Sequence, residues 1–342
     1  MAKNHAKTDR IKLALVGADT LLGRELENVL DNRGPGVAIT SYASSGEGNF
    51  SEQEGEPVYL TALESKAIET DDAILVAGGL EGAQKAYRLA KDLGGRPSVI
   101  DCTGLLDQEP EARIVAPLVF QPETTESWLL VLAHPAASAL TLVLGRIARR
   151  VKLRQSIGHI FEPASERGKQ GVSELHQQTT SLLSFKPLDT HIFDAQLSFN
   201  LLSQYGEEAP SKLSTVEQRI ERHVATLLSR HGASGIPMPS LRVVQAPVFH
   251  GYSISLWIEC ESEIDAAAIG EALGSAQIEV RAQTEDAPHS VGAASQSGLI
   301  VGDIRTDRNN PRAAWHWIVG DNLRLTADAA TDLIATLPGA ER

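Results

Sequence analysis

A glycine-containing turn near the N-terminus carries the residues best suited to hold a ligand. The segment Gly17-Ala18-Asp19-Thr20-Leu21-Leu22-Gly23 follows the apolar run 11–16 and precedes a helical pattern. In a dinucleotide fold such a turn lets helix N-terminal amides approach a pyrophosphate, because glycine has no Cβ to obstruct them. The turn keeps the outer glycines of a GxxGxxG pattern and has Thr20 in the middle position. It is either a nucleotide site or a structural turn that has lost this role.

The residues around this turn bear on the kind of ligand it would take. Asp19 adds a negative charge beside the expected phosphate position, and we expect it to cap the following helix, as aspartate commonly does. A 2′-phosphate calls for an arginine or similar cation after the second strand. Residues 42–47 offer Ser44 and an acid there. The sequence therefore predicts weak recognition of a 2′-phosphate.

Other reactive side chains are sparse. Cys102 and Cys260 are the two cysteines, and they form no CxxC pair. Because Cys102 follows an apolar strand, we expect it to be a small apolar core residue. The ten histidines include no HExxH motif, so no metal site is predicted. Ser138 is expected in the first turn of a helix, where it would cap or pack rather than attack a substrate.

The elements that must position these residues differ between the two halves of the chain. Apolar runs at 11–16, 73–77 and 98–101 alternate with helical patterns, which predicts a Rossmann-type parallel sheet covered by helices. Later, helical patterns at 138–150, 170–183 and 216–229 are mixed with strand-like runs at 157–161, 241–248 and 252–260. We expect an α/β protein whose second, α+β domain has an antiparallel sheet. The predicted domains are 1–134 and 135–321, with the helical tail 322–342 returning to the first.

The overall charge limits the classes of partner. There are 31 basic and 44 acidic residues, a formal net charge of −13, which disfavours binding to nucleic acid or to an anionic membrane surface. Residues 1–10 are polar and basic without an apolar stretch, and no segment approaches the roughly 20 apolar residues of a membrane span. With so few cysteines, we expect a cytoplasmic protein.

Four ordered segments resemble motifs of the aspartate-semialdehyde dehydrogenase family, an amino-acid biosynthetic family. They are 16–23 for VGATGxVG, 99–104 for VIDNSS, 199–206 for FNxIPxIG and 321–328 for DNLRKGAA. The resemblance extends over nearly the whole chain. Within the family, the chain most resembles the Usg-type paralogues. The resemblance implies a dinucleotide-binding domain followed by a semialdehyde dehydrogenase dimerisation domain. It also implies candidate NADP or NAD contacts at Gly17, Asp19, Thr20, Leu22, Gly23, Ser44, Gly78, Gly79 and Asn322.

The chemistry that this resemblance implies requires side chains that the sequence does not supply. A cysteine thiolate attacks the aldehyde, hydride leaves to the nicotinamide, and a histidine acts as the base. In this chain Ala137 takes the place of the cysteine within His134-Pro135-Ala136-Ala137. The resemblance assigns the family's glutamine, arginine and histidine to Glu162, Gln245 and Tyr252.

Further positions of the family's site are partly replaced and partly retained. A phosphate-binding arginine of the family falls on Asp107, whereas Arg219, with Glu217 nearby, is a retained substrate-side pair. His250 lies two residues before Tyr252, and strand alternation would place it on the opposite face, as a rim or surface histidine.

Two hypotheses follow from these residues. The first is a dimeric homologue that has lost the thioester chemistry and binds or regulates a partner, with the strands 243–248 and 254–258 at the dimer interface. The second is an NAD(P)-dependent oxidoreductase that acts on an aldehyde or other carbonyl without a thioester, with Tyr252 or Glu162 as acid or base.

Overall fold

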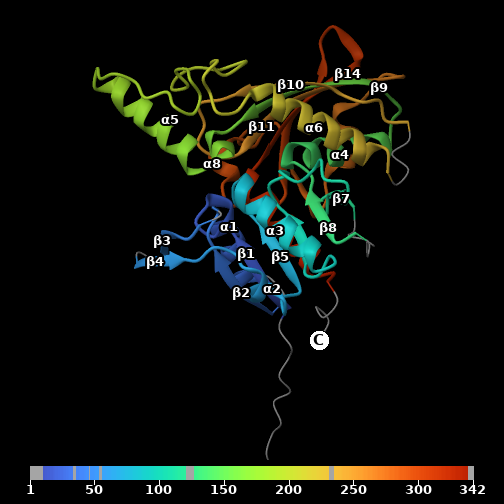
Figure 1. The fold of residues 1–342 in the computed structure, drawn as a ribbon. Coiled ribbons are helices and arrows are strands. Elements are labelled where there is room, and N and C mark those ends of the chain that lie inside the picture. The colour runs from blue at the N-terminus through green and yellow to red at the C-terminus, as the bar shows by residue number, and fades with distance from the viewer. Residues whose placement is uncertain are drawn as a thin grey trace, which may run out of the picture. The chain divides into compact units, whose positions relative to one another are not determined.

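The computed structural model describes residues 11–33, 36–45, 47–53, 56–120, 127–230 and 235–337. The N-terminal stretch 1–10, Gly46 of the loop after the second strand, and the tail beyond residue 337 lie outside these ranges. The chain divides into two compact units, 1–132 with 326–342 and 133–325 (Figure 1). Across the residues that the structure covers, no helix combines the length and apolar character needed to cross a membrane.

Unit 1 is built on a six-stranded sheet in which all neighbouring strands are parallel, in the order β2-β1-β5-β6-β8-β7. The prediction of a parallel-sheet α/β domain is thus confirmed. The order changes direction between β1 and β5, so the carboxyl ends of these two strands form the switch point at which such sheets bind ligands. The strands are β1 (Ile11–Val16), β2 (Val37–Tyr42), β5 (Ala73–Val76), β6 (Ser98–Asp101), β7 (Ala112–Val115) and β8 (Leu129–Leu132).

The remaining elements of unit 1 surround this sheet. They are the helices α1 (Leu21–Arg33), α2 (Ser65–Ile68) and α3 (Leu80–Asp92) and the hairpin β3 (Asn49–Gln53) and β4 (Glu56–Leu60). The C-terminal helix α9 (Asn322–Ile334) adds Ala327, Ala330 and Ile334 to the same apolar core. These residues recur at helical spacing, so one face of α9 is buried.

Unit 2 contains a second six-stranded sheet, in the order β10-β9-β11-β14-β13-β12. Its central pairs are antiparallel as predicted, but the outer pairs β10–β9 and β12–β13 are parallel. The physical reason is the connection, because the helices between β9 and β10 and between β12 and β13 return the chain to the same end of the sheet. The strands are β9 (Leu153–Glu162), β10 (Ser240–Gln245), β11 (Tyr252–Cys260), β12 (Ile278–Val280), β13 (Leu299–Asp307) and β14 (Asn310–Gly320).

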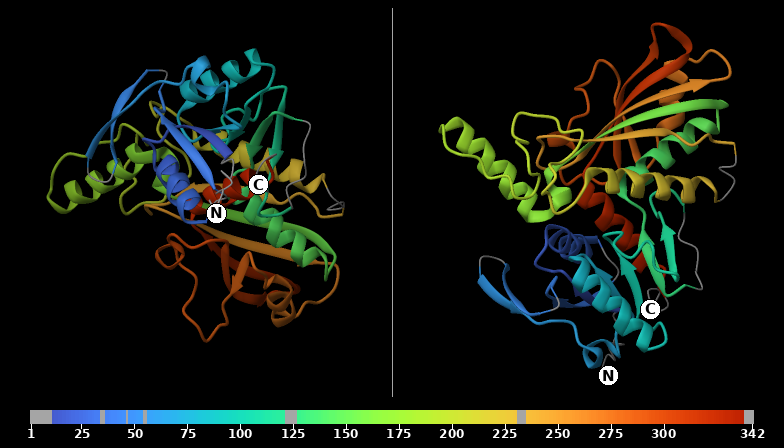
Figure 2. Two further views of the ribbon diagram at one scale, coloured as in Figure 1. Left: turned by 90° about the horizontal axis from the view of Figure 1, so that it is seen from below. Right: turned by 45° about the horizontal axis from the view of Figure 1, so that its top comes forward.

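Helices cover one face of this sheet, as Figure 1 shows for α4 (Pro135–Ala148) and α6 (Leu213–Leu228). Ile254, Leu256 and Ile258 of β11 are at most 1% exposed. These apolar side chains, expected at a dimer interface, are therefore already buried within the unit. Helix α5 (Gly168–Leu183) extends away from the sheet in both views of Figure 2. The smaller elements are η1 (Ala164–Arg167), α7 (Ala266–Leu273) and α8 (Ser290–Ala293).

Candidate functional site

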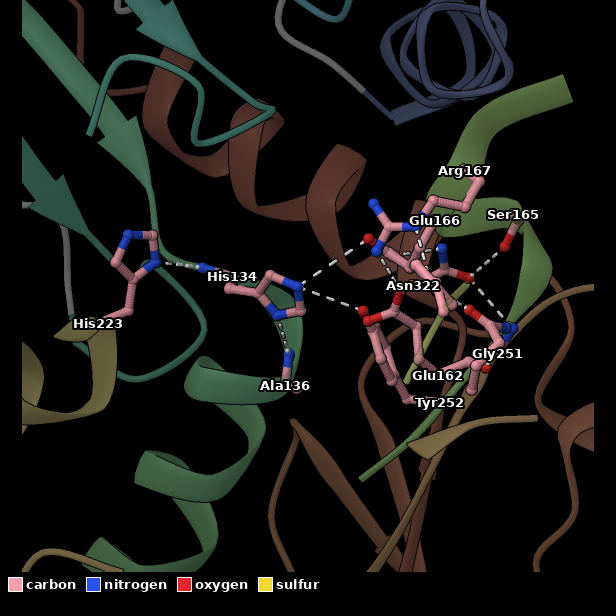
Figure 3. Close-up of polar contacts among 12 residues, drawn as sticks. His134, Ala136, Glu162, Ser165, Glu166, Arg167, His223, Gly251, Tyr252 and Asn322 are labelled. Carbon is pink, nitrogen blue, oxygen red and sulfur yellow. Dashed lines mark hydrogen bonds and ion pairs between the residues drawn. The ribbon is translucent and has the colours of Figure 1, made fainter. Parts of the chain in front are cut away.

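The candidate site of unit 2 begins where β8 ends and α4 starts. His134 is the N-cap of α4, with its ring Nδ1 accepting a hydrogen bond from the Ala136 amide at 3.3 Å, and Pro135 occupies the first helical position. The His134 amide in turn donates to Nδ1 of His223, on α6, at 2.9 Å. Proline tolerates this position because it lacks an amide hydrogen that the helix could not satisfy. Figure 3 shows both imidazoles at this helix start.

The hydrogen bonds of His134 determine its protonation state. Because Nδ1 accepts from the Ala136 amide, the neutral ring carries its hydrogen on Nε2, which lies 3.2 Å from the Tyr252 hydroxyl. Burial lowers the pKa of His134 well below its usual value, and the electrostatic effects of His223, Arg219 and Arg167 lower it further. A neutral imidazole with both nitrogens engaged orients Tyr252 rather than acting as a free base.

Glu166 completes this arrangement. Its carboxylate lies 3.9 Å from His134 Nε2, forms a hydrogen bond with Tyr252, and accepts from the Asn322 side-chain amide at 2.8 Å (Figure 3). Burial and, after it, the nearby charge of Glu162 together raise the pKa of Glu166 to about 7. Burial likewise raises the pKa of Tyr252 well above 10. Tyr252 therefore stays protonated, and Glu166 is the group that exchanges a proton near neutral pH.

These side chains form one part of a polar cluster in unit 2, and its other part is built on an ion pair. The members of the cluster are His134, Glu162, Glu166, Arg167, Tyr205, His223, Gln245, Tyr252 and Asn322. Arg167 contacts the carboxylate of Glu162, which is fully buried, and its Nε donates to the Tyr205 hydroxyl at 3.1 Å. Tyr205 donates to the Gln245 side-chain oxygen at 2.6 Å, and the Gln245 amide nitrogen donates to the Glu162 backbone oxygen at 2.8 Å. The guanidinium that could bind a substrate carboxylate is thus already paired with a carboxylate of the chain itself.

The glycine turn of unit 1 is a separate arrangement at the carboxyl ends of β1 and β5. Gly17 has φ +100°, and a Cβ there would lie 2.4 Å from the Gly78 nitrogen. A Cβ at Gly23 would lie 2.1 Å from the Gly17 oxygen, whereas one at Gly79 would meet nothing within 4 Å. Gly17 and Gly23 are therefore required by contacts within the chain, whether or not a ligand binds. Leu22 packs against the core of this unit.

Two side chains fill this turn. Thr20 Oγ1 accepts a hydrogen bond from the Gly23 amide at 2.9 Å and lies 2.9 Å from the Ala77 carbonyl oxygen, to which it can donate. It is the cap of α1, so the prediction that Asp19 caps this helix is wrong. Asp19 instead accepts from the Ser44 amide at 2.8 Å and the Ser44 hydroxyl at 2.7 Å. The shorter side chain of Thr20, one residue closer to the helix, takes the position that the cap needs.

The family model that matches this chain describes the semialdehyde dehydrogenase dimerisation domain, over residues 144–325, just over half of the chain. The chain belongs to the semialdehyde dehydrogenase family. A USG-1 protein homolog from Pseudomonas aeruginosa is 28% identical, over 96% of this chain and 97% of that protein. An aspartate-semialdehyde dehydrogenase from Rickettsia bellii is 26% identical, over 93% and 94%. A solved structure described as a probable aspartate-semialdehyde dehydrogenase from Pseudomonas aeruginosa has a TM-score of 0.81 at 28% identity, over 96% and 98%.

Within this semialdehyde dehydrogenase fold, Ala137 lies in the first turn of α4 and is fully buried. Ser138 is buried one residue later, so of the two expected roles, capping and packing, packing agrees with the structure, because His134 is the cap. Cys102 lies in the core of unit 1, where burial raises its pKa. Cys260 is eight residues from Tyr252 along β11, which corresponds to roughly 26 Å. No cysteine of unit 2 therefore lies beside the imidazole of His134.

Of the other residues predicted for the site, some lie near His134 and others do not. Arg219 is close enough to His134 for its charge to lower the histidine pKa, whereas Glu217 accepts a hydrogen bond from the Val243 amide of β10 at 2.7 Å. Two residues apart on a helix, they point to different sides. His250 lies in a bend before β11, so the expected placement on the opposite face of a strand is wrong, although it is half-buried. Asp107 belongs to unit 1.

Five members of the cluster were not identified from the sequence as site residues. Glu166 and Arg167 carried a usable signal, because these two charged residues follow closely after Glu162, the position that the resemblance assigns to the family's glutamine. His223 follows Arg219 by four residues on α6 and so shares its face. Neither His134 nor Tyr205 had a comparable signal. The described residues contain no group of three or more histidine, cysteine or acidic side chains arranged to hold a metal ion.

Proposed function

We propose that this member of the semialdehyde dehydrogenase family does not carry out the thioester reaction and acts as a homodimeric, cytoplasmic binding or regulatory protein. The observation that carries the proposal is the first turn of α4, where Ala137 is fully buried and the imidazole of the N-cap His134 contacts the phenol of Tyr252. A methyl group cannot form the thiohemiacetal. Loss of a covalent nucleophile commonly lowers the rate by about 10⁴-fold or more.

The charges of the cluster support the same proposal. A substrate carboxylate needs a guanidinium with an available fork, and Arg167 is engaged by Glu162 and Tyr205. Gln245, which the resemblance puts in place of the substrate-binding arginine, is fully buried and uses its amide to join Tyr205 to the backbone of β9. The chain thus supplies its own carboxylate to the position that an acidic substrate would take.

The homodimer is proposed from the uncovered face of the unit 2 sheet. Trp257 is opposite both Ile157 and Trp315 in the strand register, and the ring of Trp317 lies 5.8 Å from that of Phe161. Ile157 and Trp315 are 39% and 36% exposed. A band of large apolar side chains across three strands is typical of an interface. The matched model also describes a dimerisation domain.

Turnover is the direct test of the missing nucleophile. Purified protein is incubated with aspartate semialdehyde, inorganic phosphate and NADP⁺ or NAD⁺, and reduction of the dinucleotide is followed by absorbance. We expect no phosphate-dependent reduction above the protein-free rate. Ala137→Cys should remain inactive as well, because the ring of His134 is committed to Tyr252. An active aspartate-semialdehyde dehydrogenase serves as the positive control.

Wild-type turnover that Ala137→Trp abolishes would contradict the proposal. Ser138→Ala is the matched control at the same helix start, since turnover lost in that variant alone would assign attack to the serine. The dimer is tested separately by sedimentation of wild-type protein and Trp315→Glu. We expect dimer and monomer respectively, and a monomeric wild type would remove the dimer from the proposal.

A second candidate function rests on Glu166. A carboxyl group whose pKa lies at about 7, in hydrogen-bond contact with Tyr252, is a chemically suitable proton donor for reduction of a carbonyl. An oxidoreductase of this kind needs no thioester, but it does need a nicotinamide. Reduction of a panel of small aldehydes with NADPH, lost in both Glu166→Gln and Tyr252→Phe, would favour it over the first proposal. Unchanged NADPH in the presence of every aldehyde would exclude it.

A further inference from the structure

The turn between β1 and α1 contains an ionised carboxylate bound by the chain's own donors. Asp19 accepts hydrogen bonds from the amide and hydroxyl of Ser44 and, at 3.0 Å, from the side-chain amide of Asn49. Burial raises the pKa of Asp19, but the hydrogen bonds from Asn49 and Ser44 outweigh it and bring the pKa below its ordinary value. The group is therefore an anion at neutral pH. A backbone amide, a hydroxyl and a side-chain amide are the donors that commonly hold a phosphate.

The loop that supplies these donors is closed against the rest of the switch point. A Cβ at Gly78 would lie 2.9 Å from the Cα of Ser44, and one at Gly82 would lie 2.5 Å from the Ser44 oxygen. Gly78 of the β5–α3 turn and Gly82 of α3 thus allow the chain to approach itself. In a dinucleotide site the same absence of a Cβ would allow the approach of a ligand.

One amide at the N-terminus of α1 is also bound by the chain itself. The Gly23 amide, in the first turn of α1, donates to the hydroxyl of Thr20. Thr20 stands where the middle glycine of the pattern would leave room for a pyrophosphate. An incoming phosphate would have to displace this hydroxyl and approach the charge of Asp19. These residues do not fit the dinucleotide that the fold implies.

We propose that Asp19 is an internal substitute for a dinucleotide phosphate, and that it prevents NAD(P) from binding to this unit. Its carboxylate takes the donors of Ser44 and Asn49, while Thr20 takes the Gly23 amide of α1. The inference concerns unit 1 and does not depend on the missing nucleophile of unit 2. Removing the charge should return the Ser44 and Asn49 donors to an external phosphate and remove the repulsion between two anions.

Equilibrium binding to the full-length protein tests this role. NADPH and NADH are titrated and followed by fluorescence, and inorganic pyrophosphate is titrated calorimetrically as a probe of the phosphate position alone. We expect no saturation of wild type at millimolar ligand. Asp19→Ser should improve affinity by about 30-fold or more, with an affinity that falls as salt increases. The double variant Asp19→Ser/Thr20→Gly should bind more tightly still.

Asp31→Ser is the matched control, because it makes the same change at an exposed position near the end of α1. It should bind no better than wild type, as should Ser44→Ala, which removes a donor and keeps the charge. Asp19→Asn, which preserves the shape of the side chain, replaces Asp19→Ser if circular dichroism indicates that the serine variant does not fold.

Two results would overturn the inference. One is saturable binding by wild type at micromolar concentration. The other is a folded Asp19→Ser or Asp19→Asn variant that binds no better than Asp31→Ser. The failure of the inference can be told apart from failure of the proposed function, because a wild-type protein that binds NADPH without turnover contradicts the first and leaves the second intact.

Discussion

The turn of unit 1 and the polar cluster of unit 2 both place a carboxylate of the chain among donors of the chain, but with opposite effects on protonation. Asp19 faces neutral donors, and its pKa is lowered. In unit 2 two carboxylates, Glu162 and Glu166, lie near one guanidinium, that of Arg167, and the pKa of Glu166 rises to about 7. The first region is fixed in charge across the physiological range. Only the second can change its charge in response to pH.

The largest effect is expected from breaking the ion pair of the cluster. Arg167→Leu leaves the fully buried Glu162 without its cation, which should lower the free energy of unfolding by about 4 kcal/mol. Glu162→Gln/Arg167→Leu removes both charges and should recover most of that loss. Denaturant unfolding of the three proteins measures it. A double variant no more stable than Arg167→Leu would mean that the cost arises from lost packing and not from the unpaired charge.

The contrast in protonation predicts a pH dependence for the second region alone. The pKa of Glu166 rises from 4.5 to about 7 on folding, so its favourable contribution is complete below pH 4.5 and is lost as pH rises through 7. Relative to Glu166→Gln, wild type should therefore lose roughly 3 kcal/mol of unfolding free energy between pH 4.5 and pH 8. The groups that face it are Glu162, Arg167, His134, Tyr252 and Asn322.

Denaturant unfolding at a series of pH values provides this measurement. Glu263→Gln, at an exposed position of the same unit, is the control and should parallel wild type throughout. Parallel curves for wild type and Glu166→Gln would show that folding does not raise the pKa of Glu166, and would also remove the basis for its role as a proton donor.

Two glycines of the unit 1 turn test which positions are required by the fold itself. A Cβ at Gly23 would lie 2.1 Å from the Gly17 backbone oxygen, so Gly23→Ala should lower the unfolding free energy by about 2 kcal/mol without any ligand present. Gly79 meets nothing within 4 Å and has φ −70°, so Gly79→Ala should change it by less than about 0.5 kcal/mol. Thermal unfolding of both variants measures these changes in unfolding free energy, and so distinguishes a glycine that the fold requires from one that it does not. Equal effects would contradict the assignment.

The sequence predicted the elements far better than it predicted the side-chain partners. Apolar periodicity placed the parallel sheet of unit 1 and most helices, because burial on one or both faces imposes a period. Apolar periodicity did not predict that the outer strand pairs of unit 2 are parallel, because strand direction depends on how the chain returns between strands. The short hairpin β3–β4 was also missed, and its exposed Phe50 and Tyr59 explain why apolar alternation gave no signal of a buried face.

The candidate site was located by resemblance, but its geometry was not predictable. Glu162, Gln245 and Tyr252 were expected near one another and do belong to one network. Its organising residues come from distant segments: His134 from the β8–α4 junction, Tyr205 from the loop before α6 and Asn322 from the start of α9. Hydrogen bonds between residues more than a hundred positions apart leave no local pattern.

The smallest expected effect concerns which side chain caps α1, the point at which the sequence prediction and the structure disagree. Thr20→Ala removes the acceptor of the Gly23 amide and should cost about 1 kcal/mol of unfolding free energy. Thr20→Ser, which keeps the hydroxyl, should recover most of this loss. If Asp19 were the cap, Asp19→Ser would retain an oxygen acceptor and Thr20→Ala would cost nothing. Because Asp19 binds the loop after β2 instead, Thr20→Ala should destabilise helix α1 while Asn49 and Ser44 remain bound to Asp19, so the cap is lost without any gain in NADPH binding.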